Sequence, residues 1–305
     1  MAADGSTRAV VTALAANLGI AISKFVAALV TGSAAMLAES VHSVADSANQ
    51  ALLLIGGRRA KRAPSPLHPF GYARERYIYA FLVAIVLFTL GGVYALYEGY
   101  AKVTDPHELR SPLVAVAVLL VAIALEGYAL RTAVREANRV RGGQSWVQFI
   151  RHARAPELPV ILLEDAGALL GLLFALSGIG LTLATGDAVF DGIATLGIGA
   201  LLVTIAIVLA TEIKSLLIGE SATREAIDQI HTALLAEPGI DRVIHLRTVH
   251  LGPDELLVAA KVGIGGDDDG AQIAAAIDNA EARIRRAVPT ATVIYIEPDI
   301  HRPGA

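Results

Sequence analysis

The sequence predicts an α-helical polytopic membrane protein with six transmembrane helices and a small C-terminal α+β cytoplasmic domain of order αββαβ. Its 305 residues are 54% hydrophobic and only 18% charged, whereas soluble domains carry about a quarter charged residues. Six apolar segments are long enough to cross about 30 Å of hydrocarbon. After residue 210 the sequence becomes polar. We therefore expect a transmembrane domain over residues 1–212 and a cytoplasmic domain over residues 213–305.

The apolar segments run over residues 9–30, 34–57, 77–101, 112–131, 157–184 and 190–210. Only Thr31-Gly32-Ser33 joins the first two, which predicts a tight helical hairpin. The N-terminal MAADGSTR is short and polar and lacks the signal-peptide pattern, so the first segment is expected to be retained. The sequence contains no cysteine, which excludes thiolate ligands and disulfides.

Basic residues are unevenly distributed among the loops. The 57–76 and 131–156 loops are rich in arginine, the 102–111 loop is mixed, and the 184–191 loop contains only acids. Because basic loops stay in the cytoplasm, we expect an integral protein of the cell (inner) membrane with both termini cytoplasmic. The same rule explains the arginine clusters, so no nucleic-acid partner is expected.

The polar tail has a regular pattern. Residues 221–236 have helical periodicity, with Ser221 as a candidate N-cap. Residues 242–250 and 255–263 are predicted strands around a turn, and 269–287 is an amphipathic helix. Residues 291–297 form the last strand. This order predicts a small sandwich with a three-stranded sheet, and nothing in it has a catalytic pattern.

His42 and Asp46 lie in the middle of the second apolar segment. A charged side chain such as aspartate costs about 2.5–3.5 kcal/mol at this depth, so its presence indicates function. Four residues apart, the two side chains share a helix face, with Glu39 one turn earlier on the same face. A histidine and a carboxylate can hold a divalent cation and exchange it for protons. A purely structural pair is disfavoured, because buried pairs are costly and contribute little.

The fifth segment carries Glu164 and Asp165 side by side. Adjacent residues differ by about 100° around a helix, so one carboxylate can complete a site with His42 and Asp46. The other then faces a neighbouring helix or takes part in proton movement. Protonated structural carboxyls are the alternative.

Three further candidates have weaker support. Asn17 is more readily explained as an interhelical hydrogen-bonding residue, and Asp191 as an acid favoured at a helix N-terminus. His68, in the loop sequence HPFGYARER, is explained at least as well by packing. Lys24 either neutralises a buried acid or extends to the membrane surface.

Together these elements resemble the cation diffusion facilitator family of proton-coupled zinc and manganese exporters, over nearly the whole chain. The LLED segment and the HPFGYARER loop look closest to the branch related to zinc transporter nine. The resemblance implies that His42, Asp46 and Asp165 are metal ligands. Ile161 stands where zinc-exporting relatives have histidine, so Glu164 or a water would complete the site.

The resemblance also implies a homodimer whose tails dock side by side. Relatives can hold two zinc ions in the tail with histidines. Here Ile244, Ala260 and Tyr295 stand at such positions, leaving Glu297. We therefore expect a tail that needs no tightly bound metal.

The sequence thus predicts a divalent metal/proton antiporter that exports Zn²⁺ from the cytoplasm, with Mn²⁺, Fe²⁺ or Co²⁺ as alternatives. The metal is the transported substrate, and no organic cofactor is expected. His42 favours zinc, whereas the carboxylates tolerate harder ions. Two other classes remain open at this point. An intramembrane metalloenzyme would turn over without net metal flux, and a metal sensor would bind metal without moving it.

Overall fold

A computed structural model describes residues 18–107, 111–265 and 269–300 of the chain. The chain divides into two compact units. One contains residues 1–58 and 78–214, and the other contains residues 59–77 together with 215–305. The last long helix continues to Ile218, so the predicted boundary at residues 212 and 213 falls inside a helix and stays a prediction.

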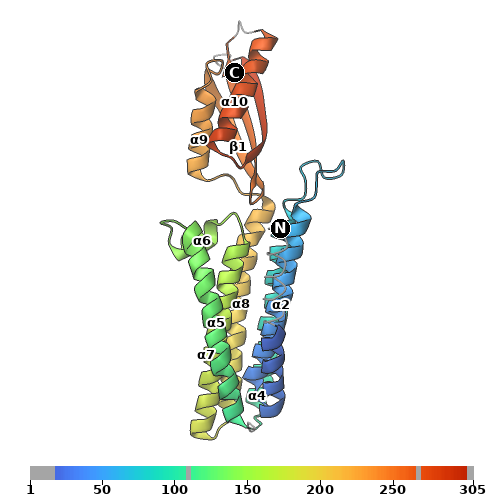
Figure 1. The fold of residues 1–305 in the computed structure, drawn as a ribbon, viewed down its shortest axis with the longest axis vertical. Coiled ribbons are helices and arrows are strands. Elements are labelled where there is room, and N and C mark those ends of the chain that lie inside the picture. Colours follow the sequence, from blue (N-terminus) through green and yellow to red (C-terminus); the bar gives the residue numbers. More distant parts are fainter. Residues whose placement is uncertain (1–17, 108–110, 266–268, 301–305) are drawn as a thin grey trace, which may run out of the picture. The chain divides into compact units, whose positions relative to one another are not determined.

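The first unit is a bundle of long helices lying alongside one another (Figure 1). A first helix spans Leu18–Thr31. The other helices of the bundle are α2 (Ala34–Ala60), α3 (Glu75–Val86), η1 (Leu87–Val93), α4 (Tyr94–Thr104), α5 (Pro112–Val140), α7 (Glu157–Thr185) and α8 (Val189–Ile218). Because α3, η1 and α4 form one continuous segment, the described chain contains the six helical segments that the sequence predicts.

Four of these segments are long and apolar enough to cross a membrane: Glu75–Thr104, α5, α7 and α8. The described part of the first helix is shorter. In α2, acids, a histidine and serines interrupt the apolar sequence, and most of these polar residues are buried in the bundle. These polar residues lower the mean hydropathy of α2, so a hydropathy threshold alone does not identify it as a membrane span.

The turn between the first helix and α2 is as tight as expected. Gly32 adopts a positive φ of 67°, a conformation that glycine reaches without steric cost. The third segment contains a π-helical turn, η1, where Gly92 lies so close to α8 that a Cβ would come within 2.6 Å of Val203 Cγ2. Such π turns occur often at functional sites.

The expected 131–156 loop is partly helical. α5 continues to Val140, and α6 (Trp146–His152) follows. Residues 131–140 contain no glycine or proline, so nothing stops the helix until Gly142, which has a φ of 58°. Ser145 and Gln148 form a reciprocal capping box at the start of α6, a pattern that fixes a helix N-terminus.

The tail has the predicted αββαβ order. It consists of α9 (Arg224–Leu235), β1 (Arg242–Gly252), β2 (Glu255–Ile264), α10 (Gly270–Ala287) and β3 (Ala291–Ile300). The sheet order is β1-β2-β3, with β1 antiparallel and β3 parallel to β2. Both helices share one apolar core with the sheet. The N-cap of α9 is Thr223 rather than Ser221, because the Ser221 hydroxyl bonds instead to Thr248.

Candidate functional site

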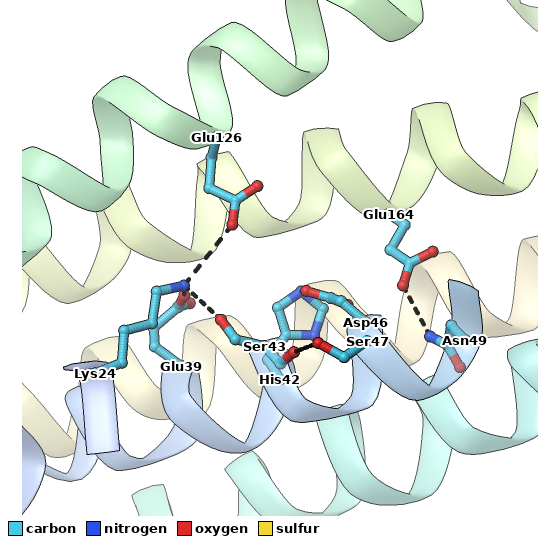
Figure 2. Close-up of polar contacts among 9 residues, drawn as sticks. All are labelled: Lys24, Glu39, His42, Ser43, Asp46, Ser47, Asn49, Glu126 and Glu164. Atoms are coloured by element: carbon cyan, nitrogen blue, oxygen red, sulfur yellow. Dashed lines mark hydrogen bonds and ion pairs between the residues drawn. The ribbon is translucent and has the colours of Figure 1, made fainter. Parts of the chain in front are cut away.

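The polar residues of α2 lie on one buried face of the helix. Glu39, Ser43 and Asn49 are each at most 4% exposed. A helix rises about 1.5 Å per residue, so Glu39 and Asn49 are about 15 Å apart along its axis. Figure 2 shows these side chains pointing toward acids from α5 and α7. The face is therefore a row of polar side chains inside an apolar bundle, which we call the polar file.

His42 and Asp46 form the middle of this file. His42 Nε2 lies 3.6 Å from Asp46 Oδ2. The His42 side chain is fully buried, and within the described residues neither imidazole nitrogen has a hydrogen-bond partner. Buried polar groups nearly always have partners, because leaving one unpaired is costly. Both imidazole nitrogens are thus available to bind a ligand.

η1 lies against the other side of His42. A Cβ added at Gly91 would be 3.6 Å from His42 Nδ1 and 3.1 Å from Leu202 Cδ1. The glycine in the π turn therefore leaves room beside the imidazole ring. Sequence reasoning missed this contact, because periodicity does not reveal a π turn.

Glu164 of α7 faces α2. Its Oε1 accepts a hydrogen bond of 2.8 Å from Asn49 Nδ2. Asp165 is half-buried on the adjoining face of α7. Of the two acids, Glu164 is the one brought against α2.

Lys24 and two acids form the next layer of the file, toward the Ala34 end of α2. Lys24 Nζ lies 3.3 Å from Glu39 Oε2 and 4.0 Å from Glu126 Oε1, and it donates a 2.7 Å hydrogen bond to Ser43 Oγ. Glu39 is thus paired with a lysine. Sequence reasoning missed Glu126, although it is the only charged residue in the 112–130 stretch.

The remaining candidates lie elsewhere. Asp191 of α8 binds the start of α2: its Oδ1 accepts from Ser33 Oγ at 2.7 Å, and its Oδ2 accepts from the Ala34 N–H at 2.8 Å. His68 packs edge-on against Tyr72, with ring centroids 4.7 Å apart. Asn17 lies outside the described residues. The structure therefore gives Asp191 and His68 local packing and capping partners.

The tail's remaining candidate ligand is also occupied. Lys261 Nζ lies 3.0 Å from Glu297 Oε1 and 3.1 Å from Asp299 Oδ2. Hydrogen bonds from the ammonium to Glu297, and then to Asp299, raise the pKa of Lys261. The ammonium therefore holds the place between these carboxylates that a cation would otherwise take.

Nowhere in residues 18–107, 111–265 and 269–300 do three or more histidine, aspartate or glutamate side chains stand in a metal-binding arrangement. The His42–Asp46 pair and the Asn49–Glu164 pair are instead neighbours along one polar face.

Comparison with known proteins places this geometry in a family. Residues 10–218 match the cation efflux transmembrane domain, and residues 222–299 match the cation efflux protein cytoplasmic domain. The chain belongs to the cation efflux family. The family resemblance inferred from the sequence is therefore confirmed, and a transporter family, rather than an enzyme family, accounts for the polar file. The intramembrane metalloenzyme is set aside.

Curated relatives cover both domains. The chain is 32% identical over 265 residues to the mitochondrial proton-coupled zinc antiporter SLC30A9 of Xenopus laevis, which spans 86% of this chain and 47% of that protein. The human protein of the same name is 31% identical over 264 residues, covering 86% of this chain and 46% of the relative. Metal tolerance protein C4 of Arabidopsis thaliana is 28% identical over 263 residues, covering 86% and 58%. The chain thus spans about half the length of these relatives.

Proposed function

We propose that this membrane protein is an antiporter that exchanges a divalent cation for protons and exports the cation from the cytoplasm. The observation that carries the proposal is the fully buried His42 imidazole, without a hydrogen-bond partner in the described chain and 3.6 Å from Asp46. Such a pair on a polar helix face offers nitrogen and oxygen donors in a low-dielectric bundle. Its cost to stability is explained by a use in transport.

The coordinating set of the proposal is His42, Asp46 and a carboxylate of α7. The hydrogen bond from Asn49 of α2 to Glu164 supports Glu164 as the first oxygen donor from α7, although the family resemblance favours Asp165. Ligands must lose their protons to bind metal. Protons arriving at this cluster would therefore expel the cation, and a cation would expel protons, which is the coupling that an antiporter requires.

Zn²⁺ is the proposed substrate, with Mn²⁺, Fe²⁺ and Co²⁺ as alternatives. The Xenopus and human relatives are named zinc antiporters, and imidazole suits zinc. Ile161 provides no donor one turn before Asp165, so the site is richer in oxygen than a site with two histidines. Oxygen donors tolerate harder ions such as Mn²⁺, and zinc should therefore be preferred only modestly.

We further propose that both termini are cytoplasmic and that the protein acts as a homodimer. The basic loops support this orientation, and the match to the family's cytoplasmic domain supports an assembly through the tail. Because the sequence has no cysteine, single cysteines report topology directly. Ala63→Cys should be labelled by an impermeant thiol reagent only from the cytoplasmic side, and Asp105→Cys only from the opposite side.

Zinc flux into proteoliposomes tests the function. With an outward-directed proton gradient, the wild type should accumulate zinc, whereas His42→Ala and Asp46→Asn should lose at least nine-tenths of the flux. His107→Ala and Asp105→Asn are matched controls, because these side chains are 71% and 82% exposed. A metal sensor would bind zinc equally well but show no flux in the wild type, and normal flux in His42→Ala would refute the site.

A further inference from the structure

We propose that Glu39, Glu126 and the Ser43 hydroxyl form a second cation site on the polar face of α2, and that the Lys24 ammonium is its resident occupant. Its role along the metal path rests on the proposed function, whereas its existence as a site does not. The ligand class is a hard divalent cation such as Mn²⁺, since all three donors are oxygens.

The geometry around Lys24 is that of a coordinated cation. Three oxygens from two helices surround Nζ: Ser43 Oγ at 2.7 Å, Glu39 Oε2 at 3.3 Å and Glu126 Oε1 at 4.0 Å. Lys24 itself comes from the first helix, so three helices meet at this point (Figure 2). The side chains of Lys24 and Glu39 are 1% and 0% exposed. Side-chain oxygens thus surround the buried ammonium.

The pocket is shaped for a carboxylate. A Cβ added at Gly171 of α7 would collide with Glu39 Oε1, so a larger residue at this position would force the Glu39 carboxylate to move. Glu39 Oε1 is buried and has no hydrogen-bond partner in the part of the chain that the structure describes. The carboxylate therefore keeps one oxygen available for a cation beyond the one that faces Lys24.

The second site lies one helical turn from the first. Glu39 precedes His42 by three residues, about 4.5 Å along α2 in the direction of Ala34. Lys24 also donates a hydrogen bond to Ser43, the residue that follows His42. A cation that leaves the His42–Asp46 pair toward the Ala34 end therefore meets the Glu39 carboxylate next.

A tethered ammonium suits this position for a physical reason. The fully buried Glu39 carboxylate without a counter-charge would be strongly destabilising, and Lys24 supplies that charge whenever no metal is nearby. Lysine is also a flexible point charge on a four-carbon stem. It can withdraw when a doubly charged ion arrives, and it excludes ions from the second site at other times.

The test measures Mn²⁺ binding to the purified full-length protein by equilibrium dialysis. All variants are made in a His42→Ala/Asp46→Asn background, which silences the first site. In this background Lys24→Met should gain a saturable Mn²⁺ site with a stoichiometry close to that of the chain. Lys24→Arg, which keeps the charge, should not gain it. Lys102→Met is the matched control, because Lys102 is also buried but donates to the carbonyls of Gly32 and His107.

Two further variants locate the gained site. Adding Glu39→Gln to Lys24→Met should abolish it, and adding Gly171→Ala should weaken it at least tenfold. Because Lys24→Met can destabilise the fold, thermal unfolding is followed in parallel. Mn²⁺ should raise the melting temperature of Lys24→Met but not that of Lys24→Met/Glu39→Gln.

The absence of both the binding and the melting shift in Lys24→Met would overturn the proposal, as would equal binding by Lys102→Met. These outcomes are independent of transport. A wild type that moves no metal refutes the proposed function while leaving the gained Mn²⁺ site intact.

Discussion

Replacing Asp191 tests whether this acid is a capping residue or a metal ligand. Both of its oxygens bind the start of α2, at 2.7 Å to Ser33 Oγ and 2.8 Å to the Ala34 nitrogen. The residue is fully buried, so water cannot replace these bonds. Asp191→Ala should therefore lower the free energy of unfolding and leave metal affinity unchanged.

The magnitude follows from the two bonds. A hydrogen bond to a charged group contributes about 1.5–3 kcal/mol in soluble proteins, which would give a total of about 3–6 kcal/mol for Asp191→Ala. Interhelical bonds in membranes average only about 0.6 kcal/mol and reach about 1.7 kcal/mol, because the unfolded chain in the bilayer also finds partners. We therefore expect a loss of about 1–3 kcal/mol. Asp191→Asn keeps one acceptor oxygen and should lose about half of that amount.

The loss in the free energy of unfolding is measured by unfolding in mixed micelles. Ser33→Ala serves as the second substitution of a double-mutant cycle. The two residues should couple positively, since removing either breaks the 2.7 Å bond. Zinc affinity, measured on the same preparations, should stay within about twofold of wild type. Unchanged stability together with a tenfold loss of zinc affinity would contradict the capping role and return Asp191 to the list of ligands.

Three other substitutions address the metal site. Glu164→Gln should reduce zinc flux more than Asp165→Asn does, because Glu164 is the acid that is hydrogen-bonded to Asn49 of α2; the reverse order in competitive flux assays would favour the ligand assignment from the family. Ile161→His should increase the preference for Zn²⁺ over Mn²⁺ in the same assay, since it adds a nitrogen donor, and an unchanged ratio would separate residue 161 from the site. Gly91→Ala should reduce flux, because its methyl group would press on Leu202 Cδ1 and fill the space beside His42 Nδ1, whereas Gly127→Ala, with nothing within 4 Å of its Cβ, should transport normally.

The sequence was sufficient to predict the long elements of the fold. Hydrophobic length locates membrane segments without reference to tertiary contacts, and alternating patterns locate the strands of the tail. His42 and Asp46 stood out because charge in an apolar segment is costly wherever the helix packs. The αββαβ order followed from local periodicity alone.

Long-range contacts could not be predicted from the sequence. Asp191 caps a helix that begins 157 residues earlier, and no local pattern predicts that pairing. Lys24 had two open interpretations until the structure placed Glu39 and Glu126 beside it. The choice between Glu164 and Asp165 depends on the rotation of α7, which packing against α2 determines. Ser221 and Thr223 are both suitable N-caps, and the bond between Ser221 and Thr248 decides between them.

The central claim is that one buried site binds either metal or protons. The most direct measurement records zinc entry and internal pH simultaneously in proteoliposomes that carry the wild type or Asp46→Asn. The wild type should move protons out as zinc enters, in a constant ratio, and should move neither when zinc is absent. Zinc entry without proton movement in the wild type, or proton-coupled entry that persists in Asp46→Asn, would contradict the account.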